Sequence, residues 1–252
     1  MVAHRAGTAK ISAMRTIDLN ADLGEGGTQD EALLALVSSA NIACGGHAGD
    51  ARTMRQTIKS ALAGGVAIGA HPSYEDRENF GREAMTIPLD HVTVLVSRQV
   101  EKLANLTHEA GARLHHVKPH GALYNQADRD GLLAAAVVAG ITGISKDLLL
   151  YAPPLGQLAA AGRAAGLTIC GEGFADRRYL TNGSLMPRSE PGALITLVDE
   201  AVAQAMKMIS DDRIGTLCIH GDGTNAVAIL QAVRKALEAS GRIKITSPLA
   251  MI

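Results

Sequence analysis

At four places in the sequence a short apolar run leads to a histidine, which is followed by small residues and then by a helix-like segment. Four histidines end such runs: His47, His71, His120 and His220. Apolar runs of this length are typical of buried strands, and strands that alternate with helices indicate a parallel sheet. The carboxyl ends of parallel strands meet at one face. We therefore expect the four imidazoles to converge, whereas one such histidine alone would usually be structural.

The alternation predicts an α/β fold, with seven or eight strands in a single parallel barrel domain over residues 14–252. The expected strands are Arg15–Asn20, Asn41–Cys44, Val66–Ala70, Arg113–Lys118, Leu148–Ala152, Leu167–Gly171, Thr216–His220 and Ile243–Ile245. The chain has 252 residues, a usual length for such a barrel, and its 47% hydrophobic content suits one large core. A doubly wound open sheet is the main alternative. Residues 1–13 are expected to be disordered or an upstream extension.

Helix-like segments fill most of the intervals between these strands. They are Asp30–Val37, Asp50–Ala63, Asp90–Ala110, Asp128–Ala139, Leu155–Ala165, Ala193–Ile209 and Ala226–Ala239, with Asp50 and Asp90 as expected amino-terminal caps. Two long polar loops remain, Ser73–Thr86 and Phe174–Glu190. Loops of this length are often functional, and we expect these two to flank the face that carries the histidines.

The charge and composition exclude several classes of protein. The net charge is −1, from 24 basic and 25 acidic residues, so no nucleic-acid footprint or membrane-surface patch is expected. No apolar stretch approaches the length of a membrane span. Three cysteines lie far apart in expected buried strands, which favours free thiols in a reducing compartment. We therefore expect a cytoplasmic protein with a small-molecule substrate.

The first strand ends in three polar residues at alternate positions, Asp18, Asn20 and Asp22. Alternation places all three on one side of the strand. Polar side chains inside a barrel are costly to bury unless they have a use. They could form a turn and capping cluster with Glu25, or they could act as a general base or a metal ligand.

The second strand leads into a loop that combines an amide, an imidazole and two glycines. Asn41 and His47 lie on either side of Gly45 and Gly46, whose small size would let the backbone approach a ligand closely. Asp50 follows in the same loop and fits a helix cap.

The densest basic cluster surrounds the end of the fourth strand. Alternation places His116 and Lys118 on one side and His115 on the other, which favours a structural role for His115. Lys118 would be a poor core residue, and it suits stabilisation of an oxyanion or a phosphate. Tyr124 follows on the next helical turn and could add a hydroxyl group.

Two later strands are followed by mixed charges. Glu172, Asp176 and Arg177 follow the sixth strand, and Asp222 follows His220. These could be turn and capping residues or substrate contacts, whereas Arg178 is expected in a surface ion pair. The sequence contains no HExxH motif, nucleophile elbow, GxGxxG motif or Walker A loop, so ATP would have to bind by another mode or on a partner.

Seven motifs together resemble the LamB/YcsF family, whose members are described as the A subunit of 5-oxoprolinase. They are DLNADLGEG (18–26), ANIACGGHAGD (40–50), GAHPSYEDRENFGR (69–82), HVKPHGALYN (116–125), GEGFADRRY (171–179), LMPRS (185–189) and CIHGD (218–222). The resemblance implies a TIM-like parallel (β/α)7-8 barrel of the glycoside hydrolase/deacetylase type. It also implies ATP-dependent opening of 5-oxoproline to glutamate, together with partner subunits B and C that would supply the ATP site.

That reaction needs a base for water, a cation for the oxygen or phosphate, and a proton donor for the ring nitrogen. The candidate catalytic residues are Asp18, Asp22, His71, Lys118 and His120. The candidate substrate-binding residues are Asn20, Glu25, Asn41, His47, Tyr124, Glu172, Asp176, Arg177, His220 and Asp222. One alternative is a metal-dependent deacetylase or amidohydrolase whose divalent ion would be bound by Asp22 with two of His47, His71 and His120. The other is a non-catalytic subunit that only binds the substrate.

Overall fold

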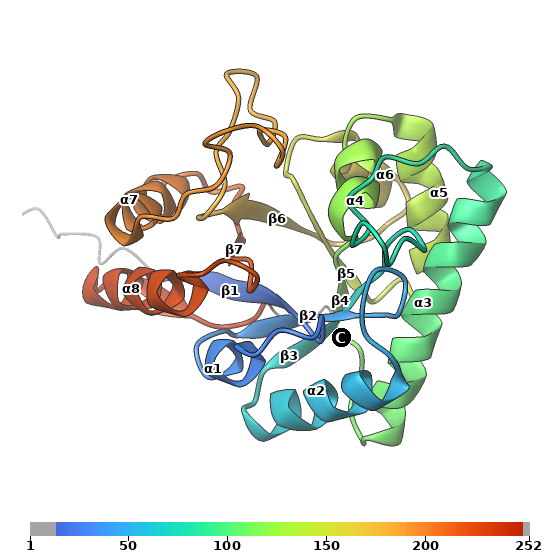
Figure 1. Ribbon diagram of the computed structural model, residues 1–252, viewed down its shortest axis with the longest axis horizontal. Coiled ribbons are helices and arrows are strands. Elements are labelled where there is room, and N and C mark those ends of the chain that lie inside the picture. Colours follow the sequence, from blue (N-terminus) through green and yellow to red (C-terminus); the bar gives the residue numbers. More distant parts are fainter. Residues whose placement is uncertain (1–13, 249–252) are drawn as a thin grey trace, which may run out of the picture.

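Seven parallel strands close into a ring in the computed structural model, which describes residues 14–248 (Figure 1). The ring consists of β1 (Arg15–Leu23), β2 (Ser39–Ala43), β3 (Ala67–His71), β4 (His116–Val117), β5 (Leu149–Ala152), β6 (Ile169–Phe174) and β7 (Thr216–Cys218). Closure is explicit because β1 pairs in parallel with both β2 and β7. The predicted parallel barrel is confirmed and the open sheet is excluded. The expected extension over residues 1–13 lies outside the described residues.

The eighth expected strand, β8 (Ile243–Ile245), exists but is not part of the ring. It pairs in parallel with Arg15–Ile17, the first residues of β1, before that strand meets β2 and β7. The long strand β1 therefore pairs first with β8 and then, further along, with β2 and β7. The barrel closes with seven strands.

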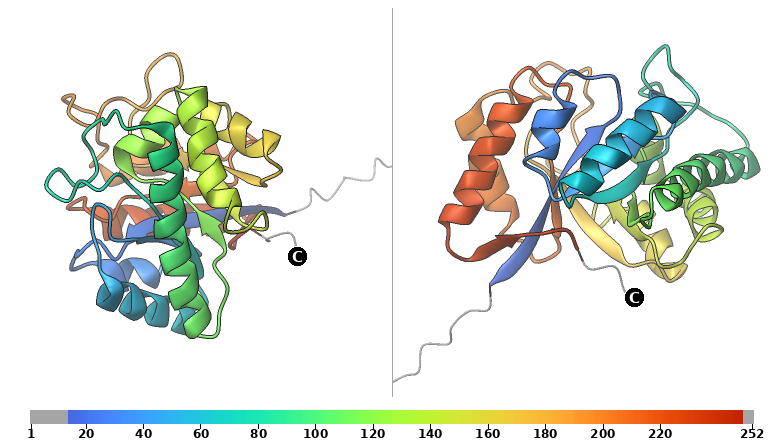
Figure 2. Two further views of the ribbon diagram at one scale, coloured as in Figure 1. Left: turned by 90° about the vertical axis from the view of Figure 1, so that its right-hand side faces the viewer. Right: turned by 90° about the horizontal axis from the view of Figure 1, so that it is seen from below.

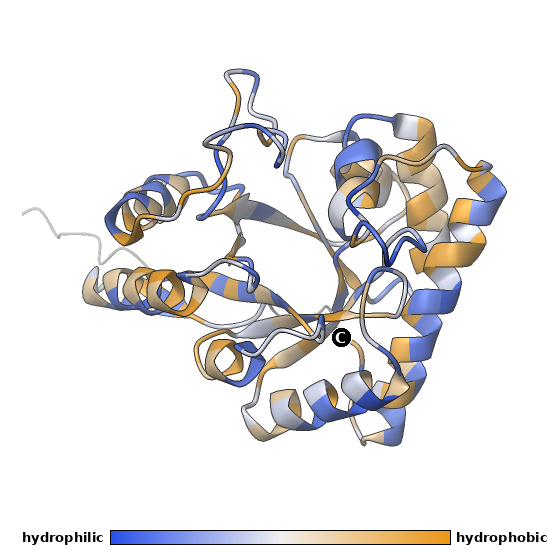
Figure 3. Cartoon of the chain, in the orientation of Figure 1, coloured by the Kyte–Doolittle hydropathy of each residue, from blue (hydrophilic) through white to orange (hydrophobic). Residues whose placement is uncertain are grey.

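Helices surround the ring on its outer side (Figures 1 and 2). They are α1 (Asp30–Leu34), α2 (Ala51–Ala63), α3 (Leu89–Glu109), α4 (Gly121–Ala127), α5 (Gly131–Thr142), α6 (Gln157–Ala164), α7 (Val198–Met208) and α8 (Ala226–Ala239). The helix α2 begins as predicted, because the Asp50 side chain accepts a hydrogen bond from the backbone N–H of Thr53. Its buried face includes Met54 and Ile58, and Figure 3 shows apolar and polar residues on opposite sides of this helix. Among the described residues, no helix is both long and apolar enough to cross a membrane.

Several predicted boundaries are wrong. The helix α3 begins after Pro88, so Asp90 lies within its first turn and is not the cap. The helix expected over Asp128–Ala139 is α5, which is capped by the side chain of Asp130 and extends to Thr142, and the preceding helix α4 was not expected. The helix expected over Ala193–Ile209 begins only at Val198. The fourth strand is shorter than expected, since only His116 and Val117 form its ladder.

The barrel interior is polar, whereas the outer faces of the strands are apolar. Along β1, Ile17 and Leu19 are buried in the apolar core, and Asp18 and Asn20 are buried with polar partners from other strands. Space for this interior depends on Gly69 of β3, because a Cβ atom there would collide with the imidazole of His116. The polar column inside the barrel leads to the carboxyl ends of the strands.

Candidate functional site

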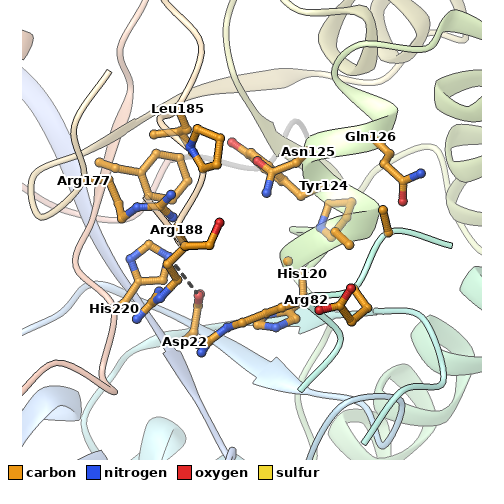
Figure 4. A pocket seen from close by; sticks show the side chains of 18 of the residues that line it. Asp22, Arg82, His120, Tyr124, Asn125, Gln126, Arg177, Leu185, Arg188 and His220 are labelled. Atoms are coloured by element: carbon orange, nitrogen blue, oxygen red, sulfur yellow. Dashed lines mark ion pairs between the residues drawn. The ribbon is translucent and has the colours of Figure 1, made fainter. Parts of the chain in front are cut away.

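A cavity of about 700 Å³ opens at the carboxyl ends of the strands (Figure 4). Its walls include side chains that follow β1, β3, β4, β6 and β7, and residues of the two long loops. The lining includes Asp22, His71, Arg82, Lys118, His120, Tyr124, Phe174, Arg177, Arg188 and His220. The predicted convergence of distant strand ends is therefore confirmed for His71, His120 and His220, while His47 lies directly behind His120.

Lys118 lies buried at the floor of this cavity between two carboxylates. Its Nζ atom is 3.0 Å from Asp22 Oδ1 and 2.9 Å from Glu172 Oε1. Cys218 Sγ lies at 3.0 Å from the same nitrogen. Burial alone would lower the pKa of Lys118, but the anionic groups around it, Asp22 first, raise that pKa well above its usual value. The ammonium group is thus held charged in a site with little access to water.

Amide and hydroxyl groups hold the two carboxylates in place. Tyr124 Oη donates a hydrogen bond to Glu172 Oε2 at 2.8 Å, and Asn20 Nδ2 donates to Glu172 Oε1 at 3.1 Å. Asn41 Nδ2 donates to Asp22 Oδ1 at 2.8 Å. These four sequence-predicted residues, Asn20, Asn41, Tyr124 and Glu172, are therefore brought together with Asp22.

His116 lies beneath this network and His115 lies outside it. His116 Nε2 lies 2.7 Å from Asn41 Oδ1, whereas His115 Nε2 lies 2.7 Å from the carbonyl oxygen of Pro248. The predicted structural position of His115 is confirmed by this contact.

Asp18 lies deeper in the barrel and does not reach the cavity. Its carboxylate accepts hydrogen bonds from the hydroxyl groups of Ser39 (2.8 Å), Thr216 (2.6 Å) and Tyr151 (3.0 Å). Burial raises the pKa of Asp18 despite these hydrogen bonds. Asp18 was expected among the catalytic residues, but it does not line the cavity, and Asp22 is the β1 carboxylate that does.

Three histidines and one glutamate form a compact group beside the floor. His71 Nε2 lies 2.9 Å from His120 Nδ1, and His47 Nε2 lies 2.9 Å from Glu25 Oε1. The rings of His47 and His120 stack with centroids 3.7 Å apart. Asp22, which the sequence suggested as a metal ligand, lies next to this group, with Oδ2 at 3.3 Å from His71 Nε2. Glu25, expected only as a substrate contact, occupies the central position instead.

His220 lies over the cavity with its ring held by Asp176. One carboxylate oxygen of Asp176 accepts from the His220 backbone N–H at 2.8 Å and lies 3.0 Å from its ring Nδ1. Burial would raise the pKa of Asp176, but His220 lowers it below its usual value. The other ring nitrogen, Nε2, lies 4.0 Å from Asp22 Oδ2 and points toward the floor (Figure 4).

Three arginines line the mouth of the cavity. Arg82 and Arg188 both place Nη2 at 2.6 Å from Asp222 Oδ2. Arg177 is buried, and its Nε atom has no hydrogen-bond partner among the described residues. Arg177 and Asp222 were predicted as site residues, but Arg82 and Arg188 were not. Both arginines lie in the two long polar loops and within two of the seven family motifs, and these were their sequence signals. Arg178 forms the expected surface ion pair, with Glu200.

Comparisons with known proteins find relatives that cover nearly the whole chain. The sequence model of the LamB/YcsF family matches residues 17–250. A protein of Methylococcus capsulatus, named as the A subunit of 5-oxoprolinase, is 49% identical over 244 residues, which cover 90% of this chain and 94% of that protein. The crystal structure of a lactam utilization protein from Thermus thermophilus matches with a TM-score of 0.85 and 38% identity, over 92% of this chain and all of that one.

A more distant structural likeness concerns the fold alone. The catalytic domain of a peptidoglycan N-acetylglucosamine deacetylase from Eubacterium rectale matches with a TM-score of 0.55 at 11% identity, over 98% of this chain and 94% of that one. The expected deacetylase-type barrel architecture is thereby confirmed.

Proposed function

Because this chain belongs to the LamB/YcsF family, we propose that it is the ring-opening component of an ATP-dependent 5-oxoprolinase, acting with partner subunits B and C. The names of its relatives, one a 5-oxoprolinase component and the other a lactam utilization protein, support a cyclic amide as the substrate. The observation that carries the proposal is the buried ammonium group of Lys118, set between Asp22 and Glu172 at the floor of a cavity with an arginine-lined mouth.

The chemistry explains why such a cavity needs both charges and a partner. A lactam is a poor electrophile, and transfer of the terminal phosphoryl group of ATP to its oxygen gives a reactive imidoyl phosphate and ADP. Water then adds to that carbon, and the carbon–nitrogen bond breaks as the nitrogen takes a proton. This leaves an acyl phosphate, which a second water converts to the γ-carboxylate of glutamate and free phosphate.

The floor residues have positions that suit these steps. Lys118 would stabilise negative charge on the oxygen or phosphate, as preorganised cations do at oxyanions. Asp22 would take a proton from water, since it lines the cavity and its Oδ2 atom lies 3.3 Å from His71 Nε2. The sequence suggested His71 or His120 as the proton donor to the ring nitrogen. The geometry favours His220, because Asp176 orients its ring and its Nε2 atom points into the cavity.

The mouth suits a substrate with more than one negative charge. 5-Oxoproline carries a carboxylate, and its activated form adds a phosphoryl group. Arg82, Arg177 and Arg188 share two carboxylates, those of Asp222 and Asp176, so the cluster keeps a surplus of positive charge for such groups.

ATP would be used by the partner subunits. The sequence has no Walker A loop, and the labile phosphorylated substrate would need a protected route between subunits. The loops Ser73–Thr86 and Phe174–Glu190 surround the mouth and are the proposed docking surface.

Reconstitution tests this function. The chain is combined with the B and C subunits of its own complex, and 5-oxoproline, ATP, ADP and glutamate are followed together. We expect glutamate to form in step with ADP only when all subunits are present. Glutamate formation at the full rate without this chain would contradict the proposal, and full coupling by the isolated chain would contradict the role of partners.

A further inference from the structure

The histidine group beside the cavity floor has its outer ring nitrogens fixed as proton donors. His71 Nδ1 lies 2.7 Å from the carbonyl oxygen of Lys118, and His120 Nε2 lies 2.9 Å from the carbonyl oxygen of Phe80. A carbonyl oxygen only accepts hydrogen bonds, so each of these two nitrogens carries a proton. In a neutral imidazole the other nitrogen then has a free lone pair.

The same reasoning applies to His47 through one hydroxyl group. Ser73 Oγ donates its proton to the carbonyl oxygen of Tyr74 at 2.9 Å, and it lies 2.9 Å from His47 Nδ1. Because the Ser73 hydroxyl has only one proton and donates it to Tyr74, Ser73 Oγ accepts a hydrogen bond from the N–H at His47 Nδ1. The close approach of Ser73 depends on Gly46, where a Cβ atom would lie 2.5 Å from Ser73 Oγ.

The inner nitrogens of the three histidines therefore present lone pairs to one another and to a carboxylate. His71 Nε2 faces His120 Nδ1 at 2.9 Å, and His47 Nε2 faces Glu25 Oε1 at 2.9 Å. Glu25 Oε1 also lies 3.6 Å from His120 Nδ1 and 3.9 Å from His71 Nε2. Four acceptor atoms this close repel one another unless positive charge lies between them.

We infer that Glu25, His47, His71 and His120 together bind one divalent transition-metal ion, with zinc as the best match. All four ligand atoms lie within 4.8 Å of one another. Tetrahedral zinc with bonds of about 2.0–2.1 Å separates its ligand atoms by roughly 3.3 Å, and the contacts above lie on both sides of that length. Three imidazoles and one carboxylate suit zinc and its neighbours rather than magnesium or calcium.

Extra protons are the competing explanation, and the ring packing disfavours them. One proton would satisfy the His71–His120 pair and a second the His47–Glu25 pair. If these protons were on His120 and His47, two imidazolium ions would lie in contact, because the His47 and His120 rings stack in parallel with centroids 3.7 Å apart. A single divalent ion satisfies all four atoms at once, and the carbonyl and hydroxyl partners of the outer nitrogens are the usual orienting contacts of metal-bound histidines.

A second group that could hold a metal is already occupied by a protein cation. Asp22, Cys218 and His220 also bring ligand atoms together. Lys118 Nζ lies 3.0 Å from Asp22 Oδ1 and 3.0 Å from Cys218 Sγ, so its ammonium group neutralises that position. The metal site therefore lies beside the cavity floor, where His71 and His120 form part of the wall and a bound ion could activate water.

Cobalt titration tests the inference without any assay of turnover, so its outcome is independent of the proposed function. The purified full chain is stripped with a chelator and titrated with Co²⁺, whose visible spectrum reports tetrahedral coordination, and Zn²⁺ is then added in competition. We expect one equivalent to bind and to be displaced by zinc. Glu25→Gln and His47→Gln should each weaken cobalt binding by about tenfold or more.

Two control variants locate the site. His108→Gln changes an exposed histidine on α3, and Asp22→Asn changes the neighbouring carboxylate, and both should bind cobalt as the unmodified chain does. Circular dichroism checks that each variant is folded, and Glu25→Gln is the mildest change because it keeps the size of the side chain and Glu25 is partly exposed. Absence of saturable binding, or wild-type affinity in both ligand variants, would overturn the inference. So would loss of binding in Asp22→Asn alone.

Discussion

Lys118 Nζ lies 2.9 Å from Glu172 Oε1, an ion pair that crosses the barrel interior from the end of β4 to β6. These two strands are not neighbours in the ring, since β5 lies between them. The pair therefore connects two strands that share no hydrogen bonds, and both residues are almost completely buried. A single contact contributes to the stability of the barrel end and to the charge of the site.

Replacing this lysine should affect both properties. Lys118→Met leaves Asp22 and Glu172 buried without their cation, which typically costs about 3–5 kcal/mol of unfolding free energy. Glutamate formation by the complex should fall by about two to three orders of magnitude. Denaturant unfolding and product assays measure the two effects. The double variant Lys118→Met/Glu172→Gln should regain part of the stability but none of the activity. Near-normal turnover in either variant would show that the role of Lys118 is purely structural.

Gly81 should be required for the histidine group. Its φ is +64°, and a Cβ atom there would lie 2.9 Å from His47 Cβ and 3.2 Å from His120 Cδ2. Gly183 is the matched control, with φ +83° and no neighbouring atom within 4 Å. Gly81→Ala and Gly183→Ala should each cost about 1–2 kcal/mol for the left-handed backbone. Only Gly81→Ala should also weaken cobalt binding, and equal cobalt affinity in the two variants would contradict this packing argument.

The mouth arginines should set the affinity for the anionic substrate. Arg188→Met leaves Asp222 paired with Arg82, so the fold should be retained. Loss of one charge-assisted hydrogen bond, at roughly 1.5–3 kcal/mol, should raise KM by about tenfold or more while kcat changes little. Steady-state kinetics of the reconstituted complex measure this, with Arg52→Met on the exposed side of α2 as control. An unchanged KM for Arg188→Met would show that Arg188 does not contribute to substrate binding.

Asp128 should make the protein less stable as the pH rises. Burial raises the pKa of Asp128 to about 6, and its Oδ1 atom has no hydrogen-bond partner among the described residues. The folded state therefore binds this proton more tightly than the unfolded state, whose pKa is near 3.8, and stability falls between about pH 4 and pH 6. Asp128→Asn should raise unfolding free energy near pH 8 by about 1 kcal/mol, allowing for solvent screening of a partly exposed group.

The pH series carries its own control. Near pH 3 the Asp128 carboxyl is largely protonated in both states, so Asp128→Asn and the unmodified chain should unfold at nearly the same denaturant concentration. A stability gain that is equal at both pH values, or that appears only in acid, would contradict the assigned cause.

Alternation along β1 predicted which side its polar residues face, but not how deep each one lies. Asp18 and Asp22 share the inner side as expected, and only Asp22 lines the cavity. Depth depends on the tilt of the strands and on which partner each residue meets. Asp18 pairs in register with Thr216, and that relationship leaves no periodic signal in the sequence.

The contacts that sequence reasoning did not predict lie where the chain turns. Glu25 reaches the histidines because the loop bends at Gly24, whose φ is +74°, and at Gly26, whose φ is +88°. Arg82 and Arg188 come from long loops without regular spacing, and they meet at Asp222 only after the barrel has formed. Strand ends were predictable because apolar runs mark them, whereas loop contacts depend on the whole fold.

One substitution distinguishes ring opening at the cavity floor of this chain from substrate binding alone. Asp22→Asn keeps the size of the side chain and leaves Lys118 paired with Glu172, so the complex should still assemble. The measurement is the rate of glutamate formation from 5-oxoproline and ATP by the complex reconstituted with this variant. The account predicts a fall of about two to three orders of magnitude. A rate close to that of the unmodified complex would show that the chain only binds the substrate and that the chemistry takes place elsewhere.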